Sequence, residues 1–97
     1  MNNTQMPIGI FDSGLGGLTV LKALQKALPK ESFLYVGDTA HLPYGNKSPE
    51  AIIEYSKSIG NFFINQKVKL IIIACNTASS IALDTLNKTF NIPIIDV

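Results

Sequence analysis

The stretch that most constrains the fold of this sequence runs from Val68 to Ser80. Its first part, Leu70 to Ala74, is an unbroken apolar run rich in β-branched residues, which is typical of a parallel strand buried on both faces of a sheet. The run stops at the only cysteine, Cys75, and passes directly into Asn-Thr-Ala-Ser-Ser, a composition typical of a helix start. This junction predicts an α/β fold with Cys75 at the carboxyl end of a strand, where such folds bind ligands.

The same alternation of strand and helix extends along the whole chain. Apolar runs predict strands at 6–11, 32–36, 70–74 and 92–97, and helical periodicity predicts a helix in each interval. Pro29 ends the first helix, and Ser48 with Pro49 starts the second as N-cap and first helical residue. Right-handed crossovers then give one doubly wound, flavodoxin-like domain over residues 1–97. We expect a four-stranded parallel sheet in the order 2-1-3-4 with helices on both faces.

Composition narrows the class of protein. A net charge of +1 with no basic cluster gives no indication of nucleic-acid binding, and a single cysteine excludes an internal disulfide framework. Residues 1–5 lack the features of a signal peptide, and no apolar run approaches the length of a membrane span. We therefore expect a cytoplasmic protein with no membrane partner. The apolar strand at 92–97 indicates either an ordinary edge strand or one piece of a longer protein.

Polar clusters follow three of the predicted strands, and parallel strands place such clusters at one edge of the sheet. Together they supply a carboxylate, a thiol, an amide and the hydroxyls of Ser13, Tyr44 and Thr77. Helix N-termini at the same edge favour negative charge, so this set suits a small, polar, anionic molecule. The clusters are Asp12-Ser13-Gly14, His41-Leu42-Pro43-Tyr44-Gly45 and Cys75-Asn76-Thr77.

Other kinds of site have little support in the sequence. A dinucleotide-binding Gly-x-Gly-x-x-Gly would need glycine at Thr19, so the glycines at 14–17 predict a tight turn between strand and helix. One cysteine and one histidine far apart do not form a metal site, and His41 is interpreted as a loop residue. Cys75 could also be a buried inert thiol, Asp12 a turn or cap residue, and Tyr44 a packing residue. These three residues are predicted to meet at one edge of the sheet, which favours a role in binding or catalysis over these structural roles.

Three segments resemble the N-terminal motifs of bacterial glutamate racemases. They are Phe11-Asp12-Ser13-Gly14-Leu15-Gly16-Gly17-Leu18-Thr19-Val20, Gly37-Asp38-Thr39-Ala40-His41-Leu42-Pro43-Tyr44-Gly45 and Ala74-Cys75-Asn76-Thr77-Ala78-Ser79. Members of this family have two facing α/β domains, so the resemblance implies that residues 1–97 are an incomplete N-terminal domain. The family's second catalytic cysteine lies in a Cys-Thr-His motif that this chain lacks.

The resemblance also implies a function. It implies cofactor-independent interconversion of L- and D-glutamate, without a metal, supplying D-glutamate for peptidoglycan, in a protein that is dimeric at full length. Cys75 would be the acid/base on one face of the α-carbon, with the Asp12 carboxylate beside it. The remaining matched positions would hold the amino and carboxylate groups of the substrate: Asp12, Ser13, Pro43, Tyr44, Gly45, Asn76 and Thr77. With one cysteine, we expect the 97-residue chain alone to be inactive.

Two alternatives stay open. Related racemases that act on aspartate or hydantoins share a cysteine at a strand end, although the Pro43-Tyr44-Gly45 turn favours glutamate. The other alternative is a non-catalytic, flavodoxin-like binding domain in which Cys75 is structural.

Overall fold

The computed structural model describes residues 6–14 and 16–97, so Leu15 of the predicted turn lies outside the described residues. Strands and helices alternate along the chain, with two short 3-10 helices, η2 and η3, inserted before α2. The elements are β1 (Ile8–Asp12), α1 (Gly17–Ala27), β2 (Phe33–Gly37), η2 (Thr39–His41), η3 (Tyr44–Asn46), α2 (Pro49–Asn65), β3 (Leu70–Ile73), α3 (Asn76–Thr89) and β4 (Ile94–Asp96). All predicted strands and helices are present, with ends that differ by a few residues.

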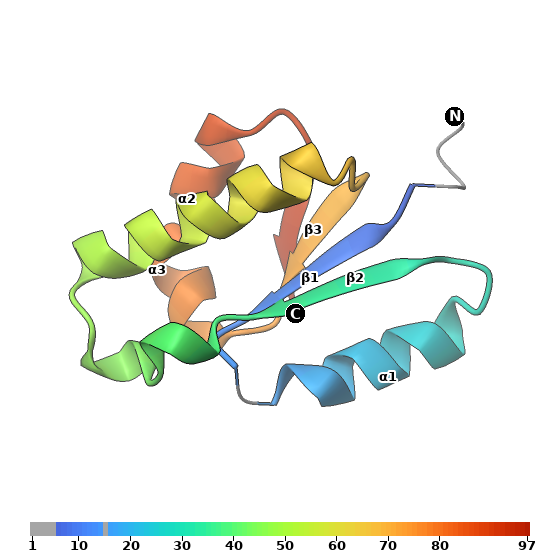
Figure 1. The fold of residues 1–97 in the computed structure, drawn as a ribbon, viewed down its shortest axis with the longest axis horizontal. Coiled ribbons are helices and arrows are strands. Elements are labelled where there is room, and N and C mark those ends of the chain that lie inside the picture. The colour runs from blue at the N-terminus through green and yellow to red at the C-terminus, as the bar shows by residue number, and fades with distance from the viewer. Residues whose placement is uncertain (1–5, 15) are drawn as a thin grey trace.

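The four strands form one parallel sheet in the order β2-β1-β3-β4, which confirms the predicted order. Ile10, in the middle of β1, pairs with Tyr35 of β2 on one side and with Ile72 of β3 on the other. Figure 1 shows α1 on one face of this sheet and α2 with α3 on the opposite face, so the fold is doubly wound.

The main core lies between the sheet and the helices α2 and α3. Because side chains alternate along a strand, Phe11, Ile71 and Ile73 point to this face. Gly9 also faces α2, and a Cβ there would lie 2.9 Å from the Phe63 ring, so α2 packs very close to β1. The helix residues that complete this core are Ile52, Phe63, Ala78, Ala82 and Leu86.

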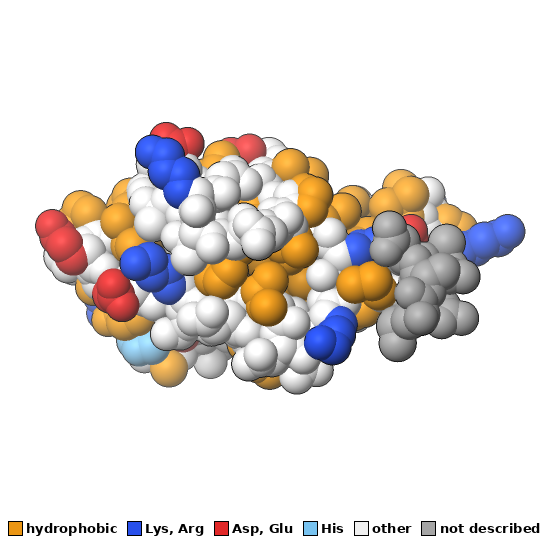
Figure 2. All heavy atoms as spheres, turned by 90° about the horizontal axis from the view of Figure 1, so that it is seen from above, with side chains coloured by type: hydrophobic (Ala, Val, Ile, Leu, Met, Phe, Trp, Pro, Cys, Tyr) orange, Lys and Arg blue, Asp and Glu red, His pale blue; other side chains and the backbone are white. Residues whose placement is uncertain are grey.

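Local sequence signals account for α2. The Ser48 hydroxyl accepts a hydrogen bond from the Ala51 N–H at 3.1 Å, and Pro49 is the first helical residue, as predicted. Figure 2 views the molecule from the α2 and α3 side, where charged side chains of both signs are scattered among apolar and uncharged polar groups. Among the described helices, none is both long and apolar enough to cross a membrane.

The opposite face of the sheet is covered less completely, because α1 packs mainly on β1 and β2. Four leucines, at positions 18, 21, 24 and 28, recur at helical spacing and predict an apolar stripe along this helix, and the middle two, Leu21 and Leu24, are half-buried. Leu18 and Leu28, which the periodicity placed on the same stripe, are 56% and 42% exposed. A single helix over two strands therefore buries the middle of its apolar stripe and leaves the leucines at its ends accessible.

Candidate active site

The carboxyl ends of β1, β2 and β3 bring the polar segments that follow them to one edge of the sheet. Asp12 is the last residue of β1, Asp38 follows β2, and Cys75 lies two residues after β3. The segments are tied together through the backbone, since the Asp38 N–H donates to the Asp12 carbonyl at 2.9 Å and the Ala74 N–H donates to the Phe11 carbonyl at 2.7 Å. Asp12 and Cys75 therefore lie at the same edge, as the parallel topology predicts.

Asp12 is fully buried on the face that α1 covers, together with Ile8 and Ile10 of the same strand. Its Oδ2 atom accepts hydrogen bonds from the Gly17 N–H at 3.0 Å and from the Tyr35 hydroxyl at 2.9 Å. Its Oδ1 atom is buried and has no hydrogen-bond partner among the described residues. A buried acceptor without a donor costs free energy, so Oδ1 is an unsatisfied polar atom at the end of β1.

The predicted glycine turn joins β1 to α1 and allows the contact with Asp12. Gly14 and Gly16 have φ angles of 116° and 85°, a region that favours glycine. Gly17, the first residue of α1, is buried, and a Cβ on it would lie 2.7 Å from the Asp12 carboxyl group. The absence of a side chain at Gly17 therefore lets its N–H approach the carboxylate.

We expect Gly17→Ala to destabilise the chain by about 1–3 kcal/mol, because the added methyl group overpacks a buried contact. Urea unfolding of the 97-residue chain measures this change. Gly45→Ala is the matched control, since a Cβ there meets no heavy atom within 4 Å. The control should change the free energy of unfolding by less than about 0.5 kcal/mol. Equal stabilities of the two variants would contradict the tight contact at Gly17.

Tyr35 is a partner of Asp12 that the sequence analysis did not identify. Burial, followed by the hydrogen bond to Asp12 and the charge of Asp12, raises the pKa of Tyr35 to about 12. The phenol is therefore protonated at neutral pH and donates a hydrogen bond to the carboxylate. The pairing of β1 with β2 explains this contact. Tyr35 pairs with Ile10, and because side chains alternate along a strand, Ile10, Asp12 and Tyr35 lie on the same face of the sheet.

Cys75 is the N-cap residue of α3, and its Sγ atom accepts a hydrogen bond from the Ala78 N–H at 3.5 Å. The side chain is 9% exposed and packs in the core cluster with Phe11, Tyr44 and Ala78. Cys75 is therefore buried, as a structural cysteine would be, and it also lies at a helix N-terminus, as a reactive cysteine would. N–H groups at this end of a helix stabilise negative charge on a sulfur atom.

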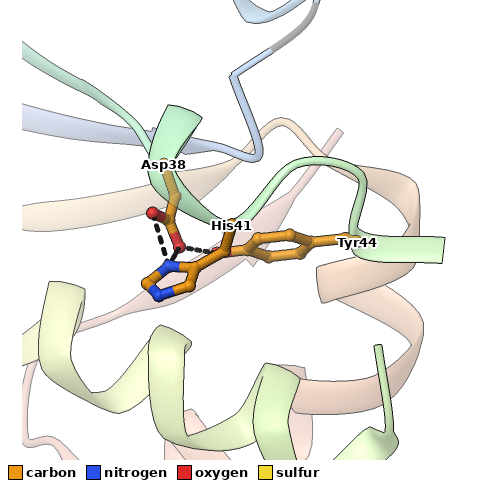
Figure 3. A network of polar contacts seen from close by, with 3 residues as sticks. All are labelled: Asp38, His41 and Tyr44. Atoms are coloured by element: carbon orange, nitrogen blue, oxygen red, sulfur yellow. Dashed lines mark hydrogen bonds and ion pairs between the residues drawn. The ribbon is translucent and has the colours of Figure 1, made fainter. Parts of the chain in front are cut away.

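The loop after β2 is organised around the Asp38 carboxylate (Figure 3). The Tyr44 hydroxyl donates to the Oδ2 atom of Asp38 at 2.6 Å, and the Nδ1 atom of His41 lies 2.8 Å from both carboxylate oxygens. The His41 ring also stacks on Tyr55 of α2, with ring centroids 3.7 Å apart. His41 is a loop residue, as interpreted from sequence, and the structure adds that it fixes the loop to α2.

The Tyr44 hydroxyl is one of the hydroxyls that the sequence predicts at this edge, and in the structure it donates to Asp38. The ring is 2% exposed and packs edge-on against Phe11, so its hydroxyl needs a partner within the protein. Burial, and then the hydrogen bond and charge of Asp38, raise the pKa of Tyr44 well above its usual range. The neighbouring residues Pro43 and Gly45 are exposed, which leaves the backbone of this turn accessible.

The remaining predicted residues lie at the same edge of the sheet. Ser13 and Thr77 are half-buried, and Asn76 is exposed at the start of α3. Ser79 of α3 bonds through its hydroxyl to Asp96 at the end of β4, a contact that the sequence analysis did not predict. Across residues 6–14 and 16–97, no three His, Cys, Asp or Glu side chains come together as metal ligands would, and no pocket is enclosed.

The fold and this edge define a class of protein: a doubly wound α/β domain with a cysteine at a strand–helix junction and a buried carboxylate at the same edge of the sheet. In sequence, the chain is 56% identical over 90 residues to a glutamate racemase of Geobacter metallireducens, covering 93% of this chain and 33% of that protein. It is 50% identical over 97 residues to the glutamate racemase of Thermus thermophilus, covering 100% of this chain and 38% of that protein. No protein-family model matches the chain.

Solved structures give the same result. The crystal structure of the Thermus thermophilus glutamate racemase in complex with β-chloro-D-alanine superposes with a TM-score of 0.92 at 49% identity, covering 98% of this chain and 37% of that one. The glutamate racemase of Francisella tularensis in complex with D-glutamate gives 0.90 at 49% identity, covering 96% of this chain and 36% of that one. In sequence and in fold, the chain matches the N-terminal part of glutamate racemases. It spans about a third of the length of the curated relatives it matches.

Proposed function

We propose that this chain acts as the N-terminal catalytic part of a glutamate racemase, which interconverts L- and D-glutamate without a cofactor. The observation that carries the proposal is Cys75, an N-cap cysteine at the sheet edge that also holds the buried carboxylate of Asp12. The similarity to a racemase whose structure contains D-glutamate supports the choice of substrate. D-Glutamate is a component of peptidoglycan, so the reaction would supply cell-wall synthesis in the cytoplasm.

The reaction is a transfer of one proton at each face of the α-carbon. The Cys75 thiolate takes the α-proton, so that the Cα–H bond breaks, an S–H bond forms and the electron pair remains on the substrate as a carbanion. A thiol on the opposite face then gives its proton to the α-carbon and becomes a thiolate, which inverts the centre. Because this chain has one cysteine, the second thiol belongs to a partner segment of the racemase. The reverse reaction exchanges the two roles.

The other residues at the edge would bind and orient the substrate. The buried Oδ1 atom of Asp12 lacks a donor, and the ammonium group of glutamate would supply one. The side chains of Ser13, Asn76 and Thr77 and the N–H of the exposed Gly45 offer donors for the carboxylates, next to the N-terminus of α3, while Pro43 and Tyr44 shape the turn before Gly45. Held in this way, the Cα–H bond would point at the sulfur atom of Cys75.

A chimeric enzyme tests the proposal. Residues 1–97 replace the matching segment of the Thermus thermophilus racemase, to which they are 50% identical over their whole length. We expect the purified chimera to convert L-glutamate to D-glutamate without added cofactor, measured by chiral chromatography. L-Aspartate and a hydantoin substrate, assayed in parallel, should show little or no turnover.

The unmodified Thermus enzyme is the positive control for the assay. Turnover of aspartate in preference to glutamate would assign the chain to a related racemase. A folded chimera that binds glutamate without racemising it, and whose cysteines alkylate no faster than an unfolded control, would support a binding domain and contradict the proposal.

A further inference from the structure

We infer that Tyr35 is a positioning residue of the active site, which sets the orientation of the Asp12 carboxylate toward the substrate. The inference rests on the proposed function, because it assigns Tyr35 a part in the racemase reaction. It goes beyond the three motifs, since Tyr35 lies on β2 outside all of them.

The geometry of the Asp12 carboxylate is the first argument. An aspartate side chain can rotate about two bonds, yet here one oxygen is held by donors from two different elements. The Gly17 N–H at the start of α1 donates at 3.0 Å, and the Tyr35 hydroxyl of β2 donates at 2.9 Å, both to Oδ2. With Oδ2 held by two donors, the plane of the carboxylate is fixed and Oδ1 is left as a buried acceptor without a partner among the described residues.

The chemistry of the tyrosine is the second argument. The pKa of Tyr35 is raised to about 12 by burial and by Asp12 itself, so the phenol keeps its proton across the neutral range and acts only as a donor toward this carboxylate. A phenylalanine at this position would keep the ring and lose the donor. The carboxylate would then be held by the Gly17 N–H alone and could rotate about that single contact.

Asp12 lies at the end of β1, between the segments that follow β2 and β3. A rotation of its carboxylate moves the acceptor for the substrate ammonium relative to Cys75. Misplacement of a reacting group by about 1 Å can cost on the order of 10²-fold in rate. Loss of the Tyr35 hydroxyl should therefore slow the proton transfer more than it weakens substrate binding.

The test compares Tyr35→Phe with the parent in the chimera. We expect kcat to fall about 10- to 100-fold, while KM and the thermal unfolding midpoint stay close to those of the parent. Tyr55→Phe is the matched control, because Tyr55 stacks on His41 and is not a partner of Asp12. The control should keep kcat within about twofold of the parent, because it keeps the ring that stacks on His41.

A second measurement tests the contact independently of activity. Tyrosine titration by ¹³C NMR on the 97-residue chain should show one phenol near pH 12, which disappears in Tyr35→Phe. In Asp12→Asn that phenol should titrate at a lower pH, because the hydrogen bond and the negative charge are lost while burial remains. An unchanged titration would show that the two side chains do not interact and would overturn the inference.

The outcomes separate the two proposals. A folded chimera that binds glutamate without racemising it contradicts the proposed function, and the role of Tyr35 in the reaction falls with it. An active chimera in which Tyr35→Phe keeps the parental kcat overturns the positioning role and leaves the proposed function standing. A fall in kcat that follows a loss of folded protein also counts against positioning, because a purely structural residue would behave in that way.

Discussion

Replacing Cys75 with serine should abolish racemisation in the chimera while the fold stays intact. Serine is a preferred N-cap residue and can accept the hydrogen bond that Ala78 now donates to sulfur, so α3 should keep its first turn. A hydroxyl is a far weaker acid than a thiol and cannot exchange a proton with the α-carbon near neutral pH. We expect turnover to fall by about 10²- to 10⁴-fold or more, the size of a lost general acid–base contribution.

The measurement is D-glutamate formation by chiral chromatography, with circular dichroism to confirm the fold. Ser80→Ala is the matched control in the same helix, since it removes an exposed hydroxyl that bonds only the Thr77 carbonyl among the described contacts. The control should keep turnover within about twofold. Turnover of Cys75→Ser close to that of the parent would reject Cys75 as the acid/base.

The 97-residue chain alone should form no D-glutamate, because its single cysteine can serve only one face of the α-carbon. The described edge also encloses no pocket, so a substrate there would lie in water of high dielectric constant. Donors in such a setting stabilise a carbanion far less than donors in a closed site. Incubation with L-glutamate in D₂O, followed by NMR and chiral chromatography, measures α-deuteration and inversion separately.

Slow deuteration without inversion agrees with a single Cys75, and the Cys75→Ser chain is the control for that exchange. D-Glutamate above the buffer blank would contradict the one-cysteine reasoning.

The same samples should show self-association by light scattering. Ile95 and Val97 at the β4 edge are 51% and 67% exposed, and an open apolar edge strand favours pairing between chains.

The sequence predicted the fold well, because hydrophobic pattern and local signals agree along this chain. The β-branched run at 70–74 favours a strand, and the proline at 49 favours the first residue of a helix. Right-handed crossovers then leave few possible orders of the strands in the sheet. Exposed Leu18 shows the limit of such patterns, since periodicity marks an apolar stripe and does not show how far the partner layer extends.

The site was predicted less completely. The positions of Asp12 and Cys75 at one edge of the sheet could be predicted from the strand ends, because the parallel topology alone decides which edge these residues reach. The partners Tyr35 and Asp38 were missed, since a tyrosine in a strand and an aspartate after a glycine are both ordinary for their elements. The direction of the Tyr44 hydroxyl also depends on long-range packing against Phe11, which no local pattern reports.

The contact between Gly9 and Phe63 has a consequence for how this protein can evolve. The layer spacing between β1 and α2 depends on a hydrogen atom at position 9, since a methyl group there would lie 2.9 Å from the aromatic ring. The loop that carries Asp38, His41 and Tyr44 leads directly into α2 and is fixed to it by the stacking of His41 on Tyr55. A side chain gained at Gly9 during evolution would therefore displace α2 and this loop together. Selection that preserves the position of the loop would then also preserve Gly9, although this glycine does not contact a substrate.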